Sequence, residues 1–168
     1  MEAIAPTLNP VVILDEVFNV STLDRKSVRQ HILHFEEFLD FIGGKAFEVE
    51  EHHNFSDGVY VRSVHLKKGD LLVGKIHKTE HSNILSKGDV SVLTEWGYER
   101  LTVENTPLIW KSQPWTKRVV YAHEDSFWTV IHPTNETDLA KIEDEVIAKN
   151  YGELELIEAQ TTIELVEV

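Results

Sequence analysis

The sequence predicts an all-β sandwich or barrel, with one helix before it and one after it. Short runs of alternating apolar and polar residues follow one another between residues 59 and 132, and turn residues separate them. Apolar residues recur at helical spacing on either side of this region. We expect one domain: an N-terminal extension (1–58), a barrel (59–133), and a C-terminal helix with an acidic tail (134–168).

The first helix is predicted from Ser21 to Ile42. Its apolar residues stand three or four positions apart, and Gly43 and Gly44 follow where a C-terminal cap belongs. Ser21 or Thr22 can supply the N-cap oxygen. His31 and His34 fall mostly on the polar side, so we expect them at the surface. The apolar positions are Val28, Ile32, Phe35, Leu39 and Ile42.

Eight short strands are expected after the polar stretch EVEEHHNFSDG, which we interpret as a loop. The breaks between strands are rich in Gly, Pro, Asn, Asp and Ser, the residues that supply left-handed backbone geometry, a fixed φ angle or local side-chain caps. This spacing of short strands is typical of a sandwich or barrel. The predicted strands are VYVRSVH, LLVGKIH, SNIL, VSVLT, ERLTV, PLIWK, RVVYAH and FWTVIH.

A second helix is predicted after Pro133, capped by Asn135 or Thr137. The tail GELELIEAQTTIELVEV alternates acidic and apolar residues. It fits a final edge strand, paired across a dimer, or a mobile acidic end, and we favour the strand. The apolar stripe of the helix consists of Leu139, Ile142, Val146 and Ile147.

Charge and composition exclude several classes of partner. The 29 acidic and 16 basic side chains give a formal charge of -13, which repels nucleic acids and anionic membrane surfaces. Apolar runs are too short to span a membrane, and the N-terminus lacks the basic region of a signal peptide. Cysteine is absent, which suits a reducing compartment. We expect a cytoplasmic protein.

The most specific motif lies between two glycines. Gly69 is followed after five residues by Lys75, then by His77 and, after three more residues, by His81; six residues later stands Gly88. This spacing resembles the first metal-binding motif of the cupin family, in which two histidines and a glutamate face the barrel interior. Here Lys75 stands in place of the first histidine. His81 stands in place of the glutamate, unless Glu80 takes that role by a one-residue slip.

The second cupin motif has its counterpart in QPWTKRVVYAHEDSFW. In the family this motif supplies a last histidine after a turn that contains proline and glycine. Counting from Pro114 puts Val119 at the ligand position and His123 at the following asparagine position. Treating Trp115 as the lost turn glycine instead puts Arg118 at the ligand position, so the two alignments stay open.

Longer stretches resemble small single-domain cupin-like proteins of phages and bacteria. The resemblance implies a cupin-type double-stranded β-helix, or jelly-roll barrel, with an N-terminal amphipathic helix and a C-terminal helix. It also implies a homodimer and, for a phage protein, the host cytoplasm, but no particular reaction. The stretches are HHNFSDGVYVRS, GKIHKTEHSNILSKGDVSVLTE and KRVVYAHEDSFWTVIHPTNETDLAKIEDE.

His77 and His81 are the candidate metal ligands. Two neutral imidazoles suit one divalent ion, Zn, Fe, Ni or Mn, and Glu80 or His123 could complete a set of three ligands. The alternative is a pair of pocket histidines that bind no metal. The other histidines near the barrel, His52, His53, His65 and His132, are expected to be solvated.

Lys75 and Arg118 are the candidate anion-binding residues, with Tyr121 beside them. Two cations facing the interior of an acidic protein would select a carboxylate or a phosphate. The alternative places Lys75 at the rim and pairs Arg118 with Glu124 or Asp125 at the surface. The tryptophans of the predicted strands are expected in the core.

The function predicted from these features is binding of a small anionic molecule in the barrel mouth, with or without a metal ion. The runner-up is a metal-dependent isomerase, hydrolase or oxygenase. A third possibility is a phage-encoded protein whose acidic surface blocks a host factor.

Overall fold

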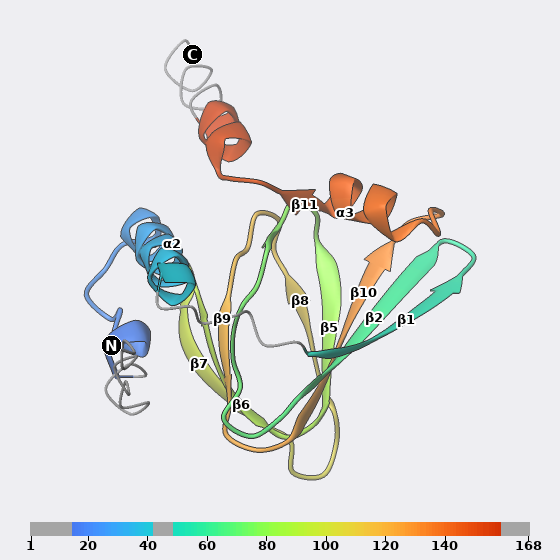
Figure 1. Ribbon diagram of the computed structural model, residues 1–168, viewed down its shortest axis with the longest axis horizontal. Helices are drawn as coiled ribbons and strands as arrows, with labels where there is room; N and C mark the ends of the chain where they lie inside the picture. The colour runs from blue at the N-terminus through green and yellow to red at the C-terminus, as the bar shows by residue number, and fades with distance from the viewer. Residues whose placement is uncertain (1–14, 42–48, 159–168) are drawn as a thin grey trace, which may run out of the picture.

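Two antiparallel sheets face each other and form a barrel (Figure 1). The computed structural model describes residues 15–41 and 49–158. The five-stranded sheet has the order β1-β2-β10-β5-β8, the four-stranded sheet has the order β3-β9-β6-β7, and β11 pairs with β4. This architecture confirms the predicted all-β barrel. The strands are β1 (Glu50–Ser56), β2 (Val59–Leu66), β3 (Leu71–Val73), β4 (Ile76–His77), β5 (His81–Lys87), β6 (Asp89–Thr94), β7 (Gly97–Thr102), β8 (Leu108–Ser112), β9 (Val119–Ala122), β10 (Ser126–Pro133) and β11 (Ile147–Ala148).

Alternation along each strand decides which side chains enter the barrel. On β9, for example, Val120 and Ala122 pack in the interior, whereas Val119 packs on the outer face. Nine buried residues from both sheets fill the interior at one end of the barrel. At roughly 25 cal/mol per Å² of apolar surface, such side chains supply most of the free energy that stabilises the fold. They are Val64, Leu66, Leu85, Val90, Val92, Val120, Ala122, Trp128 and Val130.

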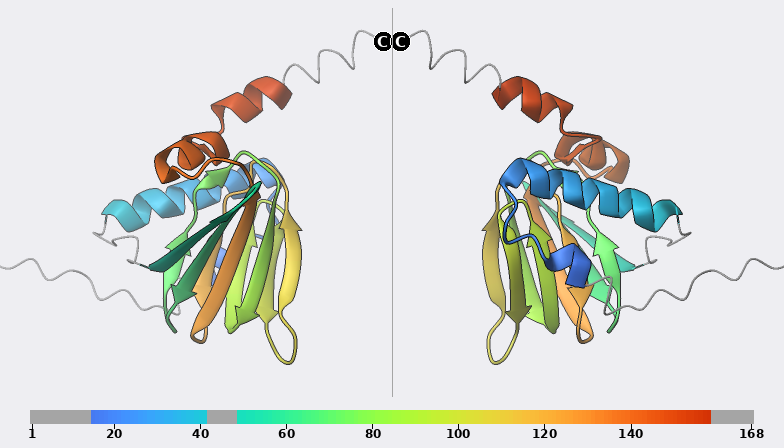
Figure 2. Two further views of the ribbon diagram at one scale, coloured as in Figure 1. Left: turned by 90° about the vertical axis from the view of Figure 1, so that its right-hand side faces the viewer. Right: turned by 90° about the vertical axis from the view of Figure 1, so that its left-hand side faces the viewer.

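Helix α2 (Arg25–Phe41) covers the outer face of the four-stranded sheet, where Ile32 packs in one cluster with Leu93 and Val119 (Figure 2). The helix begins after Asp24, whose carboxylate accepts a hydrogen bond from the backbone N–H of Ser27 at 2.8 Å. The expected caps Ser21 and Thr22 therefore lie one turn too early. The predicted C-terminal cap, Gly43 and Gly44, lies outside the described residues.

His31 is half-buried rather than at the surface, and its Nε2 forms a hydrogen bond with the Val17 carbonyl at 3.0 Å. His34 is exposed, as expected. No helix in the described ranges is long and apolar enough to cross a bilayer.

Helix α3 (Leu139–Val146) and β11 lie across one end of the barrel (Figure 1). Asp138 caps α3 by accepting hydrogen bonds from the backbone N–H groups of Ala140 and Lys141, so the predicted caps Asn135 and Thr137 are wrong. The predicted tail strand is also wrong for residues 152–158, which are helical; the rest of the tail lies outside the described residues. Tyr151 and Leu154 both pack against Ile76. They are three residues apart, which is the spacing of one face of a helix and not of a strand.

Strand β1 extends the barrel into a segment that the sequence indicated to be a loop. All seven of its residues are exposed, and it pairs only with β2, in register from Glu50 opposite His65 to Ser56 opposite Val59. Gly58, with φ of 74°, lies in the two-residue connection. The first sheet therefore begins at Glu50 and not at Val59. A fully exposed edge strand has no apolar alternation, so the pattern that revealed the other strands is missing here.

Candidate ligand and metal site

Three histidines meet inside the barrel, at the end that α3 and β11 cover. His77 comes from β4, His81 begins β5, and His132 lies near the end of β10. One ring nitrogen of each lies within 4.8 Å of the others. The rings of His77 and His132 stack with their centroids 5.2 Å apart, and the side chains of His81 and His132 are nearly inaccessible to solvent. This arrangement could hold a metal ion.

The hydrogen bonds leave nitrogen lone pairs available in this cluster. Nδ1 of His81 lies 3.0 Å from the Thr79 carbonyl, which only accepts, so Nδ1 carries the proton and Nε2 is an acceptor whose lone pair faces the Arg118 guanidinium at 3.4 Å. Nδ1 of His77 and Nδ1 of His132 are buried without a hydrogen-bond partner. Since buried nitrogens are normally paired, these orphaned atoms fit a site that takes an additional group.

Burial keeps all three imidazoles neutral at pH 7. It lowers the pKa of His81 to about 4, although the Thr79 carbonyl opposes this shift. It also lowers the pKa of His132 to about 4, and repulsion from His81 in its protonated form adds to the effect. The pKa of His77 is lowered still further, mainly by burial and in addition by repulsion from His81 and Arg118. Neutral imidazole is the form that binds metal ions.

These shifts predict acid sensitivity of the metal-free fold. Each folded-state pKa lies below the unfolded value of about 6.5, so the unfolded chain binds protons first as the pH falls. We expect the contribution of these histidines to the free energy of unfolding to be fully present above pH 6.5 and to drop, by on the order of 3 kcal/mol for each buried histidine, between pH 6.5 and pH 4. Urea titrations at several pH values measure this. In the variant His132→Gln the slope should be smaller; an equal slope would contradict the assignment.

Arg118 lies beside the cluster and is buried. Its guanidinium donates hydrogen bonds to Asn83 Oδ1 at 3.2 Å, to Ser112 Oγ at 2.6 Å and, at 3.4 Å, to His81 Nε2. All three acceptors are neutral, and no carboxylate of a described residue forms an ion pair with it. Burial lowers the pKa of Arg118 to about 10, so the group still carries its charge at pH 7.

The turn before β9 explains why Arg118 points inward. Trp115 has a φ of 65°, a left-handed conformation that a large side chain rarely adopts. Trp115 therefore occupies the backbone conformation expected of a turn glycine, which favours the alignment that puts Arg118 at the ligand position. The surface alternative for Arg118 does not occur, because Glu124 pairs with Lys68 and Asp125 accepts the backbone N–H of Lys68.

A cavity of about 280 Å³ leads from the surface to the cluster. His77 and His132 line its inner end, and Arg62 and Lys75 bring positive charge to its wall. Each of these cations has a carboxylate partner: Arg62 pairs with Glu51, and Lys75 pairs with Glu143 of α3. His81 and Arg118 do not line the cavity; Arg118 lies behind His81.

Several predicted site residues lie away from the histidine cluster. Lys75 is exposed at the rim, as in the alternative considered for it. Glu80 is exposed and pairs with Lys111, because the chain turns outward before β5. Tyr121 and His123 alternate with the inward-facing residues of β9 and therefore lie on the outer face, where His123 bonds to Ser91. Neither Glu80 nor His123 can complete the ligand set.

The third histidine of the cluster is His132, which we expected to be solvated. It is 3% exposed. The sequence contains a signal for it, since His132 has the same parity on its strand as Trp128 and Val130, both of which are buried. Of the other histidines, His52 is exposed and His65 stacks on Phe127. His53 is exposed at the cavity, with its Nδ1 2.8 Å from Tyr60 Oη.

Solved structures of similar shape include several cupins. The chain aligns with ectoine synthase from P. lautus at 11% identity and a TM-score of 0.46, over 58% of this chain and 71% of that chain. It aligns with a cupin domain from Bordetella pertussis at 10% identity and a TM-score of 0.41, over 51% of this chain and 93% of that chain. It aligns with a cupin superfamily protein from Desulfitobacterium hafniense at 10% identity and a TM-score of 0.43, over 53% of this chain and 80% of that chain. The sequence matches no protein-family model and no curated protein. The order and pairing of the strands give this chain a barrel built from two antiparallel sheets.

Proposed function

We propose that the barrel binds a small anionic molecule, a carboxylate or a phosphate, at the cluster of His77, His81 and His132, together with a divalent metal ion. The observation that carries this proposal is the charge on Arg118. A guanidinium that is buried among neutral hydrogen-bond partners leaves a positive potential in the barrel; Glu95 acts on this charge electrostatically but forms no ion pair with it. An anion beside His81 would neutralise it.

The charges along the cavity support the same conclusion. Arg62 and Lys75 are each paired with a carboxylate, so the wall of the cavity is nearly balanced. The unpaired charge is the one behind His81. At 5 Å and an effective dielectric constant of 20, an anion would gain about 3 kcal/mol from it. A positive charge behind the histidines therefore attracts an anion toward the inner end of the cavity.

Metal and anion should assist each other at this site. Three neutral imidazoles provide the ligands, but Arg118 repels a bare divalent cation. For each unit of positive charge, this repulsion is similar in size to the attraction of about 3 kcal/mol that Arg118 exerts on an anion. An anion bound with the metal offsets this repulsion. By linkage, the metal then raises the affinity for the anion by the same factor as the anion raises the affinity for the metal.

The second candidate function is metal-dependent catalysis on such an anion. It is favoured by the hydrogen bond between Tyr60 Oη and His53 Nδ1, because both groups line the cavity and could exchange protons with a bound molecule. A three-histidine set also leaves coordination positions free for a substrate. Tyr60→Phe keeps the ring and removes the hydroxyl, so it should abolish turnover while leaving the anion affinity nearly unchanged.

The proposed function is tested by calorimetric titration of the chelator-treated protein with Ni²⁺, with succinate, and with each in the presence of the other. We expect each to raise the affinity for the other about tenfold or more, and His132→Ala to lower both affinities by on the order of a hundredfold. His65→Ala is the matched control, since His65 is a half-buried histidine outside the cluster. Equal affinities in His132→Ala and in the unaltered protein would overturn the proposal.

A further inference from the structure

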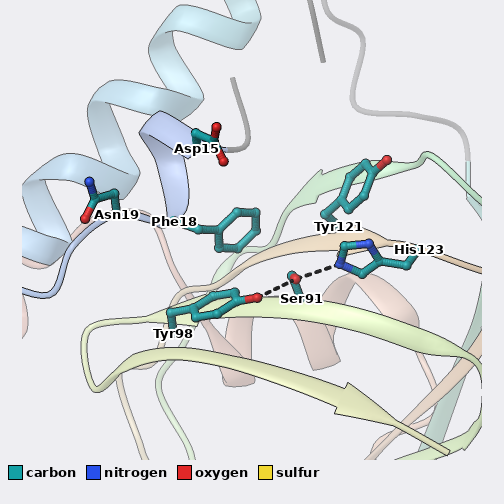
Figure 3. Close-up of a pocket in the computed structure, with 7 residues that line it drawn as sticks. All are labelled: Asp15, Phe18, Asn19, Ser91, Tyr98, Tyr121 and His123. Atoms are coloured by element: carbon teal, nitrogen blue, oxygen red, sulfur yellow. Dashed lines mark hydrogen bonds between the residues drawn. The ribbon is translucent and has the colours of Figure 1, made fainter. Parts of the chain in front are cut away.

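A second cavity, of about 400 Å³, lies on the outer face of the four-stranded sheet (Figure 3). The sheet side of its lining is provided by Ser91 of β6, Tyr98 of β7, and the residues Tyr121 and His123 from β9 and its end. Asp15 and Phe18, from the segment that precedes α2, line the opposite side. Alternation on β6 and β9 turns these side chains away from the barrel interior, so this cavity is separate from the histidine cluster.

A chain of hydrogen bonds forms the floor of the cavity. Ser91 Oγ lies 3.1 Å from Tyr98 Oη and 2.7 Å from His123 Nε2, as Figure 3 shows. Ser91 is buried in the middle of a regular strand, without the exposed and strained turn of a nucleophilic serine. These contacts therefore fix the rings of Tyr98 and His123 in position and do not indicate hydrolysis.

Three aromatic rings, those of Phe18, Tyr98 and Tyr121, surround the space above this floor (Figure 3). Phe18 and Tyr98 contact each other edge to face, with their centroids 5.3 Å apart. Aromatic rings attract cations through their quadrupoles, and sites for organic ammonium ions are built from several such rings. The cavity volume is also in the range of small-molecule sites.

The charges around the cavity have one sign. Asp15 carries the only charged side chain in the lining at neutral pH, since burial and Arg100 lower the pKa of His123. Within the described parts of the chain, Asp15 forms no ion pair. The nearest cations on the sheet are engaged: Arg100 pairs with Asp89, and Lys68 pairs with Glu124. A carboxylate that has no ion-pair partner in residues 15–41 and 49–158, and that lies beside aromatic rings, is an arrangement that suits a cation.

We infer that this outer cavity binds a small organic ammonium ion, with its cationic group between Asp15 and the aromatic rings. The site is independent of the anion site in the barrel. It needs no metal, and it would make the protein a binder of two small molecules of opposite charge, one inside the barrel and one on the outer face of the four-stranded sheet.

The test uses choline and its neutral isostere 3,3-dimethylbutan-1-ol as probes, with backbone amide chemical shifts of the full chain as the readout. We expect choline to shift the amides of Ser91, Tyr98 and His123, and to bind about tenfold more tightly than the alcohol. Asp15→Asn should remove most of this preference, and Tyr121→Leu should weaken choline binding about fivefold. Glu16→Gln is the matched control, because it removes an exposed neighbouring charge that does not line the cavity.

Equal affinity for choline and the alcohol would overturn the inference, as would an unchanged choline affinity in Asp15→Asn. Shifts centred on His77 and His132 would also overturn it, since they would place the probe in the barrel. Because neither Asp15 nor Glu16 is buried, both variants should fold normally. His132→Ala should leave choline binding intact, so failure of the anion site and failure of this site are distinguishable.

Discussion

Gly88→Ala is expected to lower the free energy of unfolding by about 4 kcal/mol or more. A Cβ atom on Gly88 would lie 2.0 Å from Ser126 Oγ and 2.6 Å from Ser126 Cα. Ser126 is fully buried, and its hydroxyl donates to the Glu124 carbonyl at 2.6 Å, so it has little freedom to move. The φ of Gly88, 111°, adds backbone strain for any other residue. Urea denaturation followed by circular dichroism measures the loss.

Gly69→Ala separates the two causes. Gly69 has a φ of 91°, but no atom lies within 4 Å of the Cβ position, so alanine there brings strain without collision. We expect a loss of about 1–2 kcal/mol. Adding Ser126→Gly to Gly88→Ala removes the two nearest colliding atoms and should recover part of the larger loss. Equal losses for Gly88→Ala and Gly69→Ala would show that the close packing of Gly88 against Ser126 is unimportant.

Arg118→Met is expected to weaken anion binding about tenfold to a hundredfold while leaving the free energy of unfolding unchanged or higher. Methionine has a similar volume and removes a charge whose burial is costly. The former partners stay hydrogen-bonded, because Asn83 Oδ1 still accepts from Trp128 Nε1 and Ser112 Oγ still accepts from Asn83 Nδ2. Succinate titration and urea denaturation of the same samples measure the two effects.

Arg118→Lys keeps the charge but should also weaken binding. Lysine has no planar fork with which to contact Asn83, Ser112 and His81 together, so its charge would not be held in place. A loss of several kcal/mol of stability in Arg118→Met, with unchanged succinate affinity, would make Arg118 a structural residue. The proposed anion site would then lose its main support.

The sequence by itself determined the barrel and part of its site. Period-two alternation between turn residues located the strands from Val59 to Pro133, because a strand buried on one face must alternate. The spacing of His77 and His81 put both side chains on the inner side, since it fixes their parity on neighbouring strands. The hydrophobic pattern of the sequence could not reveal β1, because an exposed edge strand requires no alternation. It also could not reveal the helix at residues 152–158, because the acidic and apolar residues there fit the period of a strand as well as that of a helix.

Tertiary structure decided which side chains meet. His132 joins His77 and His81 only because β10 lies beside β5 in the sheet, a pairing between segments distant in the chain. The sequence allowed two alignments around Arg118, and the left-handed backbone of Trp115 favoured one of them. The outer cavity likewise depends on the segment of Asp15 and Phe18 packing over β6 and β9. Local patterns fix the face on which a side chain lies, whereas its neighbours on that face follow from long-range strand pairing and packing.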